Sequence, residues 1–214
     1  MLRCLGFALI AIAAPIASMT QPTVSDRVTL TVASHGIAGE LQLLQDATHA
    51  TLRVVRSDGS IADAADLERP HAQLAHARLY GDAARETYLV TVDYSVGAGS
   101  YAGPITSFVE VIDGRLKWLD AADGTTGATE RIHVMRSLKT IWQIAPARAG
   151  AGQDILEARC RPAPQSAQAG EVQFTLSYYR YAFDRSRNQW IRRVREEKGF
   201  SEFEDGFPDR RLFP

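Results

Sequence analysis

Residues 86–118 carry the pattern that most restricts how this chain can fold. Apolar and polar side chains alternate over residues 88–95 and again over residues 107–112. A period of two residues is typical of β-strands, because successive side chains of a strand point to opposite faces. Asp113 and Gly114 then form a turn signal before a further strand at residues 115–119. The stretch therefore predicts a hairpin of two arms followed by a third strand.

The connection between the two arms is a run of small residues that carries one large ring. Residues 96–104 read Val-Gly-Ala-Gly-Ser-Tyr-Ala-Gly-Pro. The tyrosine ring can either fold back onto the core or project from the loop, and the sequence leaves both open. We adopt the projecting form as a functional hypothesis. It predicts partner-binding residues on this loop, namely Ser95, Gly97, Gly99, Ser100 and Tyr101.

Most of the remaining chain also has strand character. The Ala-rich residues 61–79 favour a short helix or a loop, with a strand resuming near residues 75–80, and the small residues 121–129 predict a loop. The tail, residues 199–214, is expected to pack back onto a sheet. About ten short strands with little helix predict an all-β fold, either an antiparallel sandwich, a barrel or an incomplete β-propeller. Other expected strands are residues 27–33, 40–45, 51–56, 131–136, 140–144, 154–160, 172–183 and 190–198.

Residues 1–18 have the layout of a secretory signal peptide. Arg3 precedes an apolar run that ends in small residues. The run is shorter than the roughly 20 residues of a membrane-spanning helix, so no stable membrane span is expected. A buried N-terminal helix is the alternative. We expect a cleaved segment at residues 1–18, a single β-rich domain at residues 19–214, and a periplasmic location.

The composition argues against several classes of function. The formal net charge of −1 disfavours a nucleic-acid partner, which would need a basic face. Cys4 would leave with the signal peptide, so Cys160 is expected to be a buried thiol, with an intermolecular disulfide as the alternative. The sequence has no CxxC pair and no Cys/His spacing that is typical of a zinc site.

Ser100 is the residue that most nearly resembles a catalytic nucleophile, but its surroundings do not fit. The G-x-S-x-G motif needs glycine at positions 98 and 102, where alanine stands, and it must lead into a helix. We therefore expect no enzymatic activity, no cofactor and no metal. The histidines lack the spacing of a shared metal site and are expected at the surface or half-buried: His35, His49, His71, His76 and His133.

Residues 81–86 resemble a worn form of the D-x-x-G-D-G-x-x-E segment of FG-GAP-type propeller repeats, whose acidic residues hold calcium. Asp82 and Glu86 match that pattern, whereas Arg78 and Tyr80 stand where further oxygen ligands would be expected. A calcium ion takes six or more oxygen ligands. Calcium binding is therefore not expected here.

This segment, the strand after it and the tyrosine-bearing loop together resemble periplasmic lysozyme inhibitors and related propeller-like immunity proteins, which protect bacteria from peptidoglycan hydrolases delivered by rivals. In those families a Ser-Gly-x-x-Tyr type loop enters the hydrolase cleft. Residues 97–101, Gly-Ala-Gly-Ser-Tyr, match in the tyrosine and the small residues but lack the leading Ser-Gly. Ser95 is the nearest substitute. The resemblance covers residues 79–119.

The resemblance implies a protein that blocks a secreted or injected peptidoglycan hydrolase of the lysozyme type. Tyr101 would fill the cleft, Ser100 would add a hydrogen bond, and the loop glycines would let the chain enter a narrow groove. The alternative is a periplasmic small-molecule binding or sensing module without catalytic activity, for which an apolar pocket among the strands would be the sign. An envelope enzyme would need a perturbed acid or histidine beside a nucleophile.

Overall fold

The computed structural model describes residues 22–82, 85–95, 99–148, 150–163 and 172–214, and the predicted signal peptide at residues 1–18 lies outside them. The described residues form an all-β protein of fifteen strands with two short helical turns, which confirms the predicted class with more strands than expected. The strands form three sheets, and none of the sheets closes into a barrel. No helix within the described ranges is long and apolar enough to cross a bilayer.

The first sheet is an antiparallel meander of four neighbouring strands. Its strands are β1 (Thr23–Leu30), β2 (Gly39–Gln45), β3 (Ala50–Arg56) and β4 (Ile61–Asp66). After β1 the chain leaves the sheet, because Val32–His35 form the one-turn helix α1, so the strand expected at residues 27–33 ends earlier than predicted. The short helix or loop expected at the alanines after residue 61 was wrong for residues 61–66, which form β4. These residues pair with β3, and those hydrogen bonds override a weak helical preference.

The middle sheet contains the hairpin predicted from the alternating pattern. Its strand order is β11 (His133–Met135), β7 (Ile105–Ile112), β6 (Thr87–Val92) and β5 (Ala72–Ala77), with β8 (Arg115–Trp118) paired to β7. Asp113 and Gly114 join β7 to β8 with positive φ angles of 51° and 77°, as the turn signal indicated. The arms, the turn and the third strand are therefore confirmed.

The third sheet joins strands that lie far apart in the sequence. Its order is β10 (Thr129–Arg131), β9 (Asp120–Asp123), β15 (Gln189–Lys198), β14 (Phe174–Asp184), β13 (Gln153–Pro162) and β12 (Thr140–Pro146). Strand β9 lies in the region predicted to be a loop, and it pairs in parallel with β15. The predicted loop was therefore partly wrong, because β9 gains its partner from the distant end of the chain.

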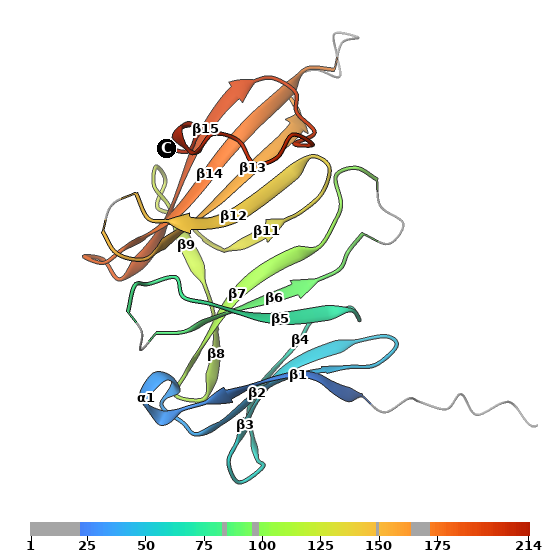
Figure 1. The fold of residues 1–214 in the computed structure, drawn as a ribbon, viewed down its shortest axis with the longest axis vertical. Helices are drawn as coiled ribbons and strands as arrows, with labels where there is room; N and C mark the ends of the chain where they lie inside the picture. Colours follow the sequence, from blue (N-terminus) through green and yellow to red (C-terminus); the bar gives the residue numbers. More distant parts are fainter. Residues whose placement is uncertain (1–21, 83–84, 96–98, 149, 164–171) are drawn as a thin grey trace, which may run out of the picture.

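The three sheets stack along the long axis of the molecule, with the first sheet at the bottom of Figure 1 and the third at the top. Tyr88, Val90 and Val92 of β6 pack toward the first sheet, whereas Leu89 of β6 and Phe108 of β7 pack toward the third. Both faces of the middle sheet are therefore covered. The tail covers the outer face of the third sheet, where Phe203, Phe207 and Phe213 pack, as predicted, and the turn η2 (Arg210–Leu212) lies close to its end.

Candidate functional site

Tyr101 lies in a tight turn within the connection between β6 and β7. The carbonyl of Gly99 accepts a hydrogen bond from the N–H of Ala102 at 3.0 Å, which places Ser100 and Tyr101 at the centre of the turn. The Tyr101 residue is 42% exposed. In Figure 1 the described parts of this connection run outward beyond the ends of β6 and β7. The ring is therefore available at the surface.

The two ends of this loop are anchored differently. At the first end, the carboxylate of Asp93 accepts hydrogen bonds from the N–H and the hydroxyl of Ser95, at 2.8 and 2.5 Å. These bonds lower the pKa of Asp93. At the second end, Gly103 lies so close to the backbone that an added Cβ would come within 1.8 Å of the Arg136 carbonyl oxygen. The loop therefore leaves the middle sheet from two fixed points.

Of the predicted partner-binding residues, the structure brings three into one turn: Gly99, Ser100 and Tyr101. Ser95 lies at the base of the loop, where its hydroxyl is used by Asp93. Gly97 lies outside the described residues. The described part of the predicted site is thus a tyrosine-bearing tip with Ser95 as a positioning residue below it.

A groove of about 480 Å³ lies at the base of the same loop. Val90, Val92 and Ile105 form one wall from the ends of β6 and β7, and Trp118 and Tyr94 add aromatic surface. Asp66, Glu68, Arg131 and His133 add polar groups from other segments, with Leu67 and Ser107 completing the lining. Sequence reasoning missed this groove because its residues come from five separate segments that only the stacking of the sheets brings together.

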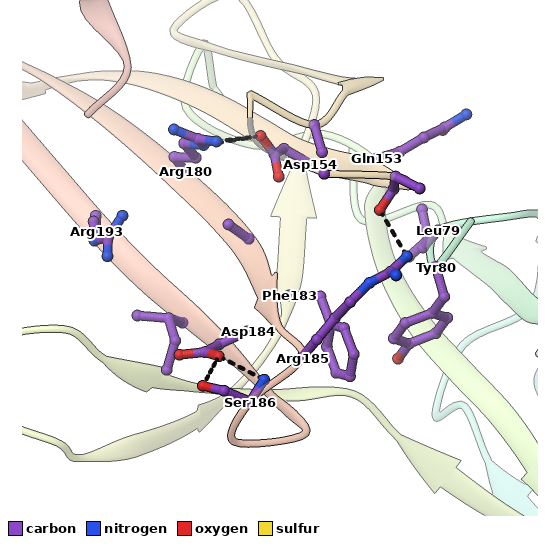
Figure 2. Close-up of a pocket in the computed structure, with 15 residues that line it drawn as sticks. Leu79, Tyr80, Gln153, Asp154, Arg180, Phe183, Asp184, Arg185, Ser186 and Arg193 are labelled. Atoms are coloured by element: carbon purple, nitrogen blue, oxygen red, sulfur yellow. Dashed lines mark hydrogen bonds and ion pairs between the residues drawn. The ribbon is translucent and has the colours of Figure 1, made fainter. Parts of the chain in front are cut away.

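A second cavity, of about 460 Å³, lies against the third sheet beside the β14–β15 hairpin. In Figure 2 Arg180 points to Asp154, with which it forms an ion pair at 2.7 Å, and Arg185 extends past Phe183 to the opposite wall. Arg185 donates to the Ala151 carbonyl there at 3.1 Å. Because these guanidinium groups already have partners, they hold the walls of the cavity together.

Glu86, which matches the calcium-binding pattern in the sequence, takes part in a hydrogen-bond network in the structure. Its carboxylate accepts a hydrogen bond from the Tyr88 hydroxyl at 2.9 Å, and His35 Nε2 lies 2.7 Å from that hydroxyl. Burial and the neighbouring Glu86 raise the pKa of Tyr88. His35 is only 2% exposed, so the expected surface or half-buried position of this histidine was wrong. Within the described ranges, no three His, Cys, Asp or Glu side chains gather as metal ligands.

The chain is thus an all-β protein of three stacked sheets. A tyrosine-bearing loop and an adjacent groove lie at the edge of the middle sheet. Cys160 on β13 is a free, buried thiol, as predicted. Comparison of the chain with protein-family models, with curated proteins and with solved structures found no match.

Proposed function

We propose that this protein is a periplasmic inhibitor or immunity protein that inserts the Tyr101 loop into the active-site cleft of a peptidoglycan hydrolase. The observation that carries the proposal is the exposure of the Tyr101 ring in a turn that stands out from the sheets. An exposed aromatic ring in a narrow turn gains buried area on binding, and a tyrosine loses little side-chain entropy.

The chemistry of the target cleft suits this loop. A glycosidase presents two carboxyl groups roughly 5–10 Å apart in a groove shaped for a sugar ring. The Tyr101 ring would occupy one sugar position, and its hydroxyl would donate a hydrogen bond to a catalytic carboxylate. Ser100, beside it in the turn, would supply a second hydrogen bond. The loop offers no glycosidic bond, so the hydrolase is blocked without cleaving anything.

The experiment is a pull-down from envelope extract, followed by a muramidase assay of the captured hydrolase with and without this protein. Tyr101→Ala should weaken inhibition by about thirtyfold, which corresponds to about 2 kcal/mol of binding free energy. Phe200→Ala is the matched control, because Phe200 is also an exposed aromatic residue, at 55%, but lies on the C-terminal tail. Unchanged inhibition by Tyr101→Ala, or a large loss of folded stability in that variant, contradicts the proposal.

The groove favours a second candidate function, a periplasmic module that binds a small molecule without catalysis. Its volume of about 480 Å³ and its mixture of aromatic and charged walls are typical of a ligand site. Native mass spectrometry of protein purified from the periplasm should then detect a retained compound. Trp118→Ala should lose that compound, whereas Tyr101→Ala should keep it, which separates this candidate from the inhibitor.

A further inference from the structure

A small polar recess of about 60 Å³ lies between β11 of the middle sheet and side chains of the third sheet. Alanine is the only apolar residue in its wall. Tyr181 is 5% exposed, and the side chains of Arg159 and Arg192 are 21% and 23% exposed. The lining residues are Ala121, Glu130, Arg131, His133, Arg159, Tyr181 and Arg192.

The register of the sheet brings these side chains together. Tyr181 of β14 lies directly opposite Arg192 of β15, so both project from the same face. Strand β13 pairs with the other side of β14, with Arg159 opposite Ser177, and side chains directly opposite each other share a face. Arg131 and His133 approach from the solvent side, where both are exposed. The solvent side of the recess is therefore formed by exposed side chains.

Two hydrogen-bond donors of the residues that line this recess have no acceptor. The Nη2 groups of Arg159 and Arg192 donate to Glu157 at 2.7 Å and to Asp123 at 3.0 Å. Their Nε–H groups are buried and have no partner within the described residues. A buried donor without an acceptor costs about 1–3 kcal/mol, which an incoming acceptor would recover.

We propose that this recess binds one small oxyanion, either a phosphate or sulfate ion or the carboxylate group of a larger ligand. The recess, at about 60 Å³, is far smaller than the groove of about 480 Å³ and suits one such small group. Oxyanions are acceptors on every side, and guanidinium groups bind them with charge-assisted hydrogen bonds. The carboxylate of a larger ligand could reach the recess from the groove beneath the Tyr101 loop, because Arg131 and His133 line both the groove and the recess.

Glu130 already places a carboxylate group beside an arginine of the recess. Its side chain forms an ion pair with Nη1 of Arg192, although it is 62% exposed and free to turn outward. Arg131, Arg159 and Arg192 are thus balanced by Glu130, Asp123 and Glu157, so binding rests on directed hydrogen bonds more than on net charge. Removing the Glu130 charge should therefore strengthen binding of an added anion.

The test uses the full chain and two probes, inorganic phosphate and acetate, in NMR titrations that follow the arginine Nε–H signals. Two of these signals, those of Arg159 and Arg192, should shift in a saturable manner. Arg131→Gln should weaken the apparent affinity by about tenfold, and Glu130→Gln should strengthen it. Arg27→Gln is the matched control, because it removes one positive charge from an exposed position on β1.

Saturation by phosphate alone assigns the recess to a tetrahedral oxyanion, and saturation by acetate assigns it to a carboxylate. Absence of a saturable shift with either probe overturns the proposal, because water alone then fills the recess. An equal loss of affinity in Arg27→Gln and Arg131→Gln also overturns it, since that result reflects general charge screening. Arg27, Glu130 and Arg131 are all exposed, so none of the three variants should disturb the fold.

Discussion

At the scale of single residues, the Tyr88 hydroxyl links two sheets. His35 Nδ1 lies 3.0 Å from the Thr31 nitrogen and 3.2 Å from the Thr31 carbonyl oxygen, and its Nε2 lies 2.7 Å from the Tyr88 oxygen. Tyr88 in turn donates to Glu86. The chain of hydrogen bonds therefore runs from α1, beside the first sheet, to the start of β6 in the middle sheet.

Replacing Tyr88 with phenylalanine should lower the free energy of unfolding by about 1–3 kcal/mol, because buried His35 then loses its hydrogen-bond partner. The measurement is urea unfolding at neutral pH. Tyr94→Phe is the control, since Tyr94 is only partly buried and lies in the groove. Equal stability of the two variants would show that the buried hydroxyl contributes nothing.

The pKa of His133 is lowered from its usual 6.5, first by partial burial and then by the positive charges of Arg159 and Arg131, against the opposing effect of Glu130. A histidine whose pKa is lower in the folded state than in the unfolded state stabilises the fold above pH 6.5. That stability is lost as the pH falls below this value.

His133→Gln should therefore flatten the decline in unfolding free energy between pH 7 and pH 5. Chemical denaturation of both proteins across this range measures the difference. Parallel curves for the wild type and the variant would contradict the prediction. Added sulfate should also raise the pKa of His133 if an anion occupies the recess beside it.

At the scale of elements, the loop between β6 and β7 depends on two glycines in different ways. Nothing lies within 4 Å of a Cβ placed on Gly99, whereas a Cβ on Gly103 meets the backbone of Arg136. The tip therefore tolerates side chains, but the base needs the close approach that only glycine allows.

Gly103→Ala should cost about 1–3 kcal/mol of stability, because the Cβ forces the backbone at Arg136, just after β11, away from the loop. Gly99→Ala should be neutral or stabilising by up to about 1 kcal/mol, since it restricts only the unfolded chain. Thermal unfolding of the two variants in parallel provides the comparison. The prediction fails if Gly99→Ala is the more damaging of the pair.

At the scale of the whole molecule, the C-terminal tail closes the outer face of the third sheet. Phe213 is 1% exposed and stacks on Phe207 with ring centroids 5.2 Å apart. Its carbonyl accepts a hydrogen bond from Arg148, and the carbonyl of Pro214 accepts one from Arg180. The last residues of the chain thus act as part of the core.

Phe213→Ala should destabilise the protein by about 3–5 kcal/mol, the cost of a cavity left by a buried aromatic ring. Phe200→Ala, on the same tail but 55% exposed, should cost about 1–2 kcal/mol, since the ring contacts Phe174 and the Lys139 ammonium. Equilibrium unfolding in guanidinium chloride measures both. Similar losses in the two variants would show that the tail contributes only weak surface contacts.

The sequence by itself determined the strands of residues 86–118, the turn at Asp113 and Gly114, and the burial of Cys160. These features depend on local geometry: alternation along a strand, a turn that needs positive φ, and an apolar side chain within a strand. The tyrosine-bearing tip was also predictable, because Gly99, Ser100 and Tyr101 are neighbours in the chain.

The tertiary structure alone decided the rest. The alanines after residue 61 became a strand, and β9 found a parallel partner in β15, because hydrogen bonds to distant strands outweigh local preference. The groove and the arginine recess likewise combine residues from strands far apart in the sequence. The stacking of the sheets and the register of their strands determine which distant residues become neighbours. An alternating sequence pattern specifies only the face of the strand on which a side chain lies, and not which residues pack against that face.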